Sequence, residues 1–487
     1  MKQFHSTVSR RDFMKGLGLV GAGLGAASLA VPVFRDLDEA ISDKRAVMKR
    51  PWWVKEVDEM TTEVDFTVMQ RFSEGESMRG SRIKRFEEAR LTRPEEVDRY
   101  NRLQQAAPGI TKQGILDNTP GLTLRDQAIG TAAAGNIRSA TGYRGTFLNE
   151  MKTSTPEVRG VPKWAGTDPE ENLRMLTTIM RGFGAMSVGS CEVIPATTQK
   201  FVYSQEPSFQ QFIHFRDVDA PIANETEHVI PNSYRWAITY VVQESVQVRL
   251  MEGHSQGFAP LSRYVRAPII QAGVQEFLRA IGYDAVGTDG NSLAIAPAFT
   301  TYTGLTEMSR LNRGFAPEWG PALGGWAMIT NLPLPDTRPI DAGMLRFCAT
   351  CLKCRDACGF GAPNEEKEPQ WAPEGRQAGL YHTLGKKVYW DDQILCQSWK
   401  AIPGACSNGR CFGACVFNKL ENGAAIHNIV KGTVSTTGLF NGFFRQMDDL
   451  MGYGPGPNVD GPNPRVAEYW DKEMMIMGID THIGFNP

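Results

Sequence analysis

The sequence predicts an α+β fold in which a core domain is followed by a small cysteine-rich module. Segments with helical periodicity alternate with short apolar runs over residues 160–340, and eight of the nine cysteines lie between Cys348 and Cys415. A chain of 487 residues also exceeds one ordinary domain, because about 150 residues per domain gives about three domains. We therefore expect several units, divided as follows: a signal peptide over 1–30, an N-terminal covering region over 31–160, the core domain over 161–340, the cysteine module over 341–425 and a tail over 426–487.

The composition excludes several classes of protein. Hydrophobic residues make up 41% of the chain and charged residues 22%, as is typical of globular domains. The 52 basic and 54 acidic residues leave a net charge of −2, so the chain as a whole does not attract a polyanion and we expect no nucleic-acid partner. Nine cysteines in 487 residues are too few for a disulfide-stapled scaffold.

The first thirty residues have the features of an export signal. Arg10 and Arg11 precede an apolar, glycine-rich run over 16–31, and the small-x-small sequence that ends at Ala30 suits a cleavage site. The paired arginines indicate the twin-arginine route, and the run is shorter than the ~20 residues that a membrane span needs. The alternative is a buried N-terminal helix. No other stretch is long and apolar enough to span, so we expect an exported protein that is soluble or peripheral on a membrane.

Two helices of the core domain can be placed from their end signals. Residues 167–170 form a capping-box arrangement with the Thr167 hydroxyl as N-cap, and the helix that follows should end at Gly184. A second amphipathic helix is predicted to begin near Pro268 and to end at Gly282.

The cysteine spacing predicts two iron–sulfur clusters. Cys348-x2-Cys351-x2-Cys354-x3-Cys358 has the spacing of a bacterial ferredoxin motif, in which the fourth cysteine ligates the other cluster. Four more cysteines complete two sets. We assign one [4Fe–4S] cluster to Cys348, Cys351, Cys354 and Cys415, and the other to Cys358, Cys396, Cys406 and Cys411.

Two other interpretations of these cysteines remain open. A structural zinc site would use paired C-x2-C knuckles, and disulfides would suit an exported chain although C-x2-C pairs make strained bridges. The motif also departs from the usual pattern, because Gly359 and Val416 stand where a proline normally follows the fourth cysteine. Cys191, alone in a strand-like run from Ala185 to Ile194, is expected to be a small buried hydrophobic residue.

Several motifs resemble one known family. They occur in order and lead into the cysteine module: Phe277–Tyr283, Gly304–Arg310, Pro317–Pro321, Asn331–Leu334, Pro339–Gly343, and in the tail Phe440–Phe444 and Gly452–Pro455. Together with the export signal and the ferredoxin motif, they resemble the catalytic subunits of corrinoid-dependent reductive dehalogenases, and the signal and tail resemble the Dehalococcoides type.

The resemblance implies a nitroreductase-like core that binds base-off cobalamin, followed by a ferredoxin-like module with two [4Fe–4S] clusters. It implies reductive removal of halide from a small organohalide in organohalide respiration. It also implies a small integral-membrane anchor protein, an upstream respiratory electron donor and a position on the outer face of the cytoplasmic membrane. The histidine-ligating signature D-x-H-x-x-G is absent in full, and we interpret the near match Asp480–Gly484 as chance.

The resemblance also implies roles for five residues. Tyr264 corresponds to the proton donor and Asn291 to an active-site asparagine, whereas Trp399 would form a wall of the substrate pocket. Glu307 and Arg310 are expected to bind the cofactor. Two of these residues also have a purely structural interpretation. Tyr264 is then a half-buried residue at the start of a helix, and Trp399 is a residue that packs beside a cluster.

One expected group is missing. The family has an Arg or Lys a few residues after the Gly-Pro of Pro317–Pro321, and here Gly324 occupies that place. Asn291, the corrin environment or another cation such as Arg313 could replace it, although a solvated surface arginine is the simpler interpretation of Arg313. The missing cation keeps open a corrinoid reductase of a non-halogenated substrate. An electron-transfer subunit without its own active site is the other alternative.

Overall fold

A computed structural model of the chain supplies the coordinates. It describes the following residues: 50–77, 82–134, 146–149, 154–205, 211–246, 258–287, 293–373, 382–406, 409–419, 425–453, 469–471 and 473. The predicted signal peptide, Asn291 and Asp480–Gly484 lie outside the described residues.

A four-stranded sheet forms the centre of the core domain, in the order β2-β6-β10-β7 with antiparallel neighbours throughout. Its strands are β2 (Ser187–Glu192), β6 (Trp236–Gln243), β7 (Ala285–Val286) and β10 (Leu323–Thr330). The strands β6 and β10 are paired over their whole lengths, which places Trp326 opposite Tyr240. Cys191 lies in β2 with no exposed surface, as predicted for a small buried hydrophobic residue.

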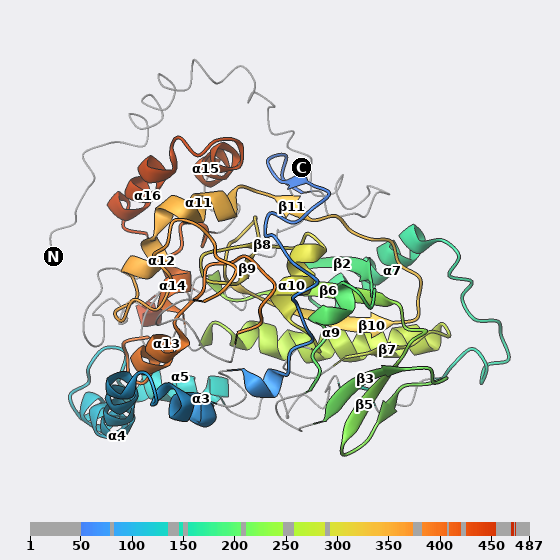
Figure 1. The fold of residues 1–487 in the computed structure, drawn as a ribbon, viewed down its shortest axis with the longest axis horizontal. Coiled ribbons are helices and arrows are strands. Elements are labelled where there is room, and N and C mark those ends of the chain that lie inside the picture. The colour runs from blue at the N-terminus through green and yellow to red at the C-terminus, as the bar shows by residue number, and fades with distance from the viewer. Residues whose placement is uncertain are drawn as a thin grey trace.

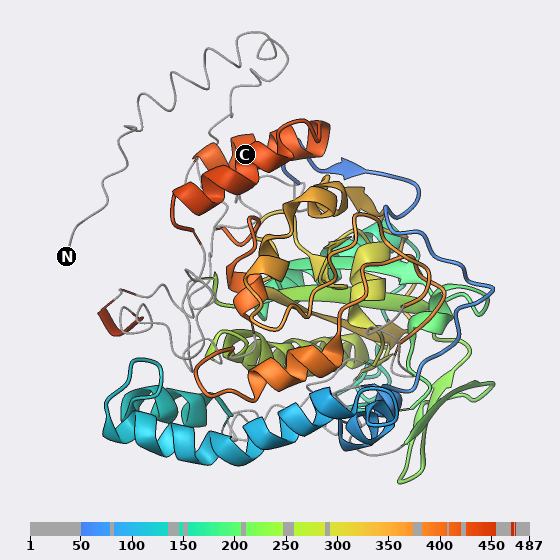
Figure 2. The ribbon, with the colours of Figure 1, turned by 60° about the vertical axis from the view of Figure 1, so that its left-hand side comes forward.

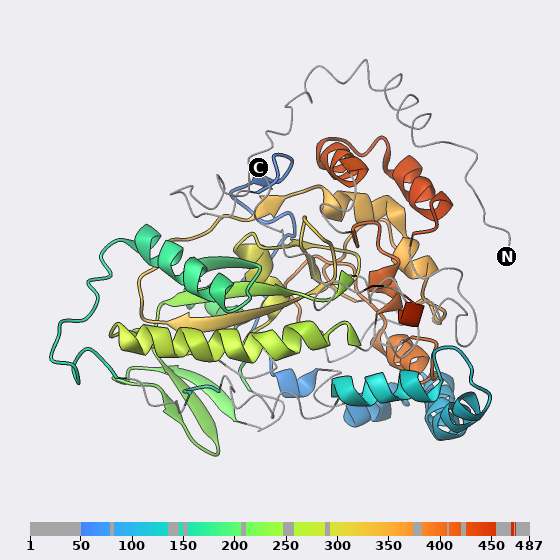
Figure 3. The same cartoon turned by 180° about the vertical axis from the view of Figure 1, so that it is seen from behind.

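Helices cover both faces of this sheet (Figures 1 and 3). Two long helices, α7 (Pro169–Gly182) and α9 (Leu261–Ala280), pack on one face, and the short α10 (Ala296–Tyr302) packs on the other. Alternate residues of β6 show the division, since Ile238 joins the α7–α9 side whereas Ala237 joins the α10 side. The mixed α and β architecture agrees with the predicted fold class.

The predicted helix ends were right, but the predicted starts were wrong. Gly184 and Gly282 follow α7 and α9 with positive φ, as C-terminal stops require. The N-cap of α7 is Asp168 rather than Thr167, because the Asp168 carboxylate accepts the N–H groups of the first turn. Similarly, α9 begins at Leu261 and Pro268 lies inside it. A proline inside a helix removes one hydrogen bond and crowds the carbonyl four residues before it, and the packing of α9 on the sheet offsets that cost.

Smaller elements surround the core. A three-stranded ribbon projects from one end of the molecule, two short strand pairs lie beside the module, and two 3-10 turns complete the periphery (Figure 1). They are β3 (Phe212–Arg216), β4 (Ile222–Ala223), β5 (Glu227–Pro231), β8 (Glu307–Met308), β9 (Gly314–Phe315), β1 (Lys55–Glu56), β11 (Ile340–Asp341), η1 (Glu74–Glu76) and η2 (Thr198–Phe201).

The cysteine-rich segment consists of short helices joined by loops. They are α11 (Met344–Cys351), α12 (Lys353–Asp356), α13 (Gln393–Lys400) and α14 (Arg410–Gly413). Helices α15 (Ala425–Thr436) and α16 (Asn441–Leu450) cover one side of this segment (Figure 2). On the other side the N-terminal region supplies α3 (Arg82–Ala89), α4 (Pro94–Leu116) and α5 (Leu124–Ala134), and α4 packs along α13.

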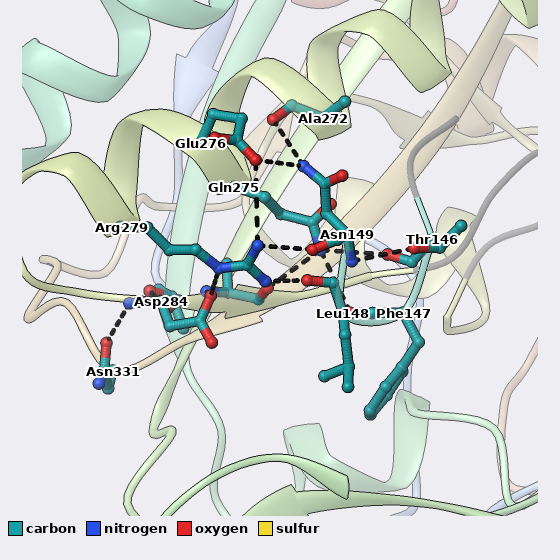
Figure 4. A network of polar contacts seen from close by, with 12 residues as sticks. Thr146, Phe147, Leu148, Asn149, Ala272, Gln275, Glu276, Arg279, Asp284 and Asn331 are labelled. Atoms are coloured by element: carbon teal, nitrogen blue, oxygen red, sulfur yellow. Dashed lines mark hydrogen bonds and ion pairs between the residues drawn. The ribbon is translucent and has the colours of Figure 1, made fainter. Parts of the chain in front are cut away.

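A polar network attaches residues 146–149 of the N-terminal region to α9 (Figure 4). Gln275 donates to the carbonyls of Thr146 and Phe147 at 3.1 and 3.2 Å, and Arg279 donates to the carbonyl of Asn149 at 2.6 Å. Arg279 also pairs with Asp284 at 3.1 Å, just beyond the helix. These bonds satisfy backbone carbonyls that the sheet does not use, and they fix the position of α9.

Candidate functional site

The first cysteine set is shaped by a break between two helices. Cys348 and Cys351 lie on α11 and Cys354 lies on α12, and the residue between the helices, Leu352, has a φ of 55°. A left-handed conformation is uncommon for a residue with a Cβ. Here it turns the chain so that the three thiols line one cavity.

That cavity is lined by all four cysteines that the sequence grouped, Cys348, Cys351, Cys354 and Cys415. Most of its remaining wall is apolar, and it includes Phe347 and Phe417. Burial raises the pKa of Cys348 to about 11 and that of Cys351 to about 12. These thiols are therefore neutral at physiological pH on their own, and a bound metal group would have to displace their protons.

The second set also lies together. Burial and then the neighbouring thiols of Cys406, Cys396 and Cys358 raise the pKa of Cys411. The Cys358 sulfur accepts the backbone N–H of Ala362 at 3.3 Å. The geometry therefore brings together the two groups of four that the spacing suggested.

Two further observations bear on the nature of these groups. All nine cysteines are free thiols, so the structure does not support the disulfide interpretation. Within the described ranges, no three His, Cys, Asp or Glu side chains converge closely enough to hold a single metal ion. The thiolates of an iron–sulfur cluster bind separate iron atoms and need not converge on one point.

Arg310 fixes the backbone around the first set. Its side chain is buried, and it donates to the carbonyl of Cys348 through Nε at 2.9 Å and through Nη2 at 2.6 Å. Its Nη1 donates to the carbonyls of Asn364 and Glu366, each at 2.7 Å. Arg310 also lines the cavity, but its polar atoms are directed at the protein backbone. It therefore positions the cysteine loop.

Glu307 has a comparable role at the start of α11. Its carboxylate accepts the backbone N–H groups of Ala342, Met344 and Leu345 at 2.9, 3.1 and 3.2 Å. Complete burial raises the pKa of Glu307 to about 7, although these hydrogen bonds oppose the shift. The residue thus satisfies N–H groups at the helix N-terminus, where an acidic group is also favoured by the helix dipole.

Trp399 lies within the second cysteine set. It is buried on α13, where its ring packs against the backbone of Gly359 so closely that a Cβ there would come within 2.7 Å of it. Phe360 lies beside it, with ring centroids 6.4 Å apart. These contacts are those of a residue that packs beside the cysteine loops. They agree with the structural interpretation of Trp399 that the sequence left open.

Tyr264 lies in the first turns of α9, half-buried against the sheet. Its ring meets Trp326 of β10 edge-on, with centroids 6.3 Å apart. The neighbouring Arg263 donates from Nη2 to the Tyr264 hydroxyl at 3.2 Å and from Nη1 to the carbonyl of Leu323 at 2.7 Å. The same guanidinium pairs with the buried carboxylate of Glu244 at 2.6 Å.

Arg263 and Glu244 were not found from the sequence, although Arg263 directly precedes Tyr264. The candidate Arg313 lies elsewhere, about 6.0 Å from the ring of Phe412. Its charge acts on Cys411, and the described contact of the Tyr264 hydroxyl is with Arg263 instead.

The segment 320–323 lies between the surroundings of Tyr264 and those of the first cysteine set. The carbonyl of Leu323, at the start of β10, accepts from Arg263. Shortly before it in sequence, Gly320 has a φ of 79° and lies so close to the backbone of Phe417 that a Cβ would come within 2.4 Å of the Phe417 carbonyl oxygen. Phe417 follows Cys415 and lines the cavity. Residues 320–323 therefore contact both Arg263, which bonds the Tyr264 hydroxyl, and the loop that follows Cys415.

Comparison with known proteins agrees with this architecture. The family model described as "Reductive dehalogenase subunit" matches residues 49–205. The chain is 29% identical to the chloroethene reductive dehalogenase of Dehalococcoides mccartyi strain VS over 99% of both proteins. It is 27% identical to the tetrachloroethene reductive dehalogenase of Sulfurospirillum multivorans over 74% of this chain and 75% of that protein.

The chain is therefore similar to reductive dehalogenases over nearly its whole length. Among solved structures, a catabolic reductive dehalogenase matches the chain with a TM-score of 0.56 and 18% identity, which shows a shared fold. The match covers 85% of this chain and 53% of that longer chain. A second solved reductive dehalogenase, described in terms of B12-dependent dehalogenation, matches with the same TM-score over 89% of this chain and 55% of that chain.

Proposed function

We propose that this protein is a respiratory reductive dehalogenase that removes halide from a small organohalide. The observation that carries the proposal is the presence of two groups of four buried or half-buried thiols together with a tyrosine–arginine pair at the edge of the core sheet. The relatives that match over most of their length are named for chloroethene and trichloroethene, so small chlorinated alkenes are the first substrates to test.

We assign the four-stranded sheet and its helices to a nitroreductase-like core over 161–340, and the cysteine-rich segment to a ferredoxin-like module over 341–425. The four thiols that line this cavity fit one [4Fe–4S] cluster, because cysteine thiolates are the usual ligands of such clusters. The second group of four would hold the other cluster.

Cobalamin supplies, when bound, the cobalt at which the carbon–halogen bond is broken. The described residues do not by themselves outline a corrin site, and residues 247–257 and 288–292, which adjoin this edge in sequence, lie outside them. Cobalamin therefore enters as a property of the family. No residue of this chain is assigned to hold it.

The reaction consumes two electrons and one proton. The carbon–halogen bond breaks, the halide leaves with the bonding pair, and a carbon–hydrogen bond forms in its place. Tyr264 is the proton donor in this proposal: an ordinary tyrosine has a pKa of about 10, so its hydroxyl carries a proton at neutral pH. Trp326 and the sheet behind it hold the phenol ring in place.

We further propose that the protein is exported by the twin-arginine route and is held at the outer face of the cytoplasmic membrane by a small integral-membrane protein. The paired Arg10 and Arg11 before a short apolar run support the export step. None of the helices in the described part of the chain combines the length and apolar character needed to cross a membrane. An upstream respiratory donor would supply the electrons.

The proposal is tested with anaerobically prepared protein loaded with iron, sulfide and cobalamin. Chloride release from tetrachloroethene, trichloroethene and chloroethene is measured with a chemical reductant. We expect release by the wild type and a loss of about 10²–10⁴-fold in Tyr264→Phe. Tyr240→Phe is the matched control, because Tyr240 also contacts the ring of Trp326 and is fully buried. Failure of the loaded wild type to release halide from any of these compounds would contradict the proposal.

A further inference from the structure

We propose that Arg263 stabilises the negative charge left on Tyr264 after proton donation, and that Glu244 and Gly324 hold Arg263 in position. The inference rests on the proposed function, because it needs Tyr264 to act as the proton donor. It adds to that function the residues that place the Arg263 cation at the Tyr264 hydroxyl.

The guanidinium group of Arg263 divides its contacts between two sides. Nη1 binds the Glu244 carboxylate at 2.6 Å and the carbonyl of Leu323 at 2.7 Å, whereas Nη2 reaches the Tyr264 hydroxyl at 3.2 Å. In the Arg263–Glu244 ion pair, the guanidinium of Arg263 is therefore the group that bonds the phenol oxygen of Tyr264, and the carboxylate bonds the other end of the guanidinium. A donor at this distance also hydrogen-bonds a phenolate, and the bond strengthens once the acceptor is charged.

The environment increases the effect of this cation. The Arg263 side chain is 20% exposed and Glu244 has no exposed side-chain surface. Charges interact more strongly where water is largely excluded, and an arginine keeps its charge at any physiological pH. Burial alone would lower the pKa of Arg263, but Glu244 and Tyr264 outweigh that effect and the pKa is raised. Glu244 thus keeps the guanidinium charged and fixed.

Gly324 makes room for this arrangement. A Cβ at position 324 would lie 2.4 Å from Cδ of Arg263 and 2.7 Å from the ring of Trp326. The aliphatic stem of Arg263 therefore occupies the space that any side chain at 324 would need. A cation carried on residue 324 and the present position of Arg263 exclude each other, so the glycine is part of the arrangement that uses Arg263.

The test compares variants of the loaded enzyme over a range of pH. Arg263→Gln removes the charge, Arg263→Lys keeps it, and Gly324→Ala displaces the arginine stem while leaving Arg263 itself unchanged. Arg266→Gln is the matched control, because Arg266 lies on the same helix and bonds to backbone carbonyls, including that of Gly184, without reaching the tyrosine. The readouts are kcat, KM, the alkaline limb of the pH profile, and iron and cobalamin content.

We expect Arg263→Gln to lower kcat by about 10- to 100-fold with little change in KM, since one hydrogen bond to a charged group is lost. The alkaline limb should move to higher pH, because a cation lowers the pKa of a neighbouring phenol and its removal raises it. Arg263→Lys should recover part of kcat, Gly324→Ala should resemble Arg263→Gln, and the control should leave the limb unmoved.

Two results separate this inference from the proposed function. If Tyr264→Phe loses halide release but Arg263→Gln keeps kcat within twofold and the same alkaline limb, the inference is wrong and the proposed function stands. If Tyr264→Phe stays fully active, Tyr264 is not the proton donor and both the proton-transfer step and the inference are wrong. Should Arg263→Gln fail to load its cofactors, Gly324→Ala decides: an unmoved alkaline limb in that variant overturns the inference.

Discussion

Arg310→Lys should weaken the cysteine module while leaving the core sheet intact. The arginine spans two sides of the module, with the carbonyl of Cys348 on one side and those of Asn364 and Glu366 on the other. A lysine ammonium is a single point and cannot reach both sides, so either the Cys348 carbonyl or the carbonyls of Asn364 and Glu366 lose their charged donor. Each unsatisfied group costs about 1–3 kcal/mol, which gives a loss of about 1–6 kcal/mol for one or two groups. The upper end of that range is a large part of the 5–15 kcal/mol or so by which a typical domain is stable.

The assay measures iron and acid-labile sulfide per chain after anaerobic loading, together with the urea midpoint of unfolding. We expect reduced iron content in Arg310→Lys, because metal binding and folding of such a module are coupled. The control is Arg346→Lys, which changes a half-exposed arginine of the same helix, α11, that pairs with Asp341. If Arg310→Lys retained wild-type iron and the wild-type midpoint, its bonds to the cysteine loop would not be what positions the thiols.

Three other predictions follow from the site and the sequence. The loaded protein should contain about eight irons and eight sulfides, since a [4Fe–4S] cluster holds four of each; Cys354→Ser should remove about half or collapse the module, and zinc without labile sulfide would contradict both clusters. Glu307 has a pKa raised to about 7 from 4.5, so the stability that it contributes is present below about pH 4.5 and is lost as the pH rises toward 7. The urea midpoint of Glu307→Gln should lack this part of the pH dependence, and equal slopes for both proteins from pH 5 to 8 would refute the assignment. Replacing Arg10 and Arg11 by lysine should leave the protein in the cytoplasm with its signal uncleaved, and normal export of this variant would show that the route is wrong.

The features that depend on local spacing were predictable from the sequence. Cys348 to Cys358 carry the ferredoxin spacing within one short stretch, and the structure places the first three thiols around one cavity. The stops at Gly184 and Gly282 are equally local, because a positive φ favours glycine at one position. The start of α9 was missed, since packing on the sheet outweighs the local signal of Pro268.

The contacts of the polar site residues were not predictable, because their partners lie far along the chain. Glu307 was expected to bind the cofactor, but its carboxylate caps a helix that begins at Met344. Arg310 likewise bonds to carbonyls as distant as that of Glu366. The resemblance to a family suggested a cofactor-binding role for both residues, and the fold shows that they bond to the protein backbone. Gly324 is a similar case. From the sequence, position 324 only lacked an expected cation, whereas the structure shows that the side chain of Arg263 occupies the space next to this glycine.

The continuous stretch 310–323 links the two halves of the site. At its first residue, Arg310 holds the carbonyl of Cys348, and at its last residue the carbonyl of Leu323 accepts from Arg263 beside the tyrosine. Between them, Gly320 lies against the backbone of Phe417 with no room for a side chain. Electron transfer depends on distance and proton transfer on hydrogen-bond geometry, so both need fixed positions. A mostly buried stretch bonded to both groups fixes them relative to each other, as the proposed function requires of a cysteine module that serves the core.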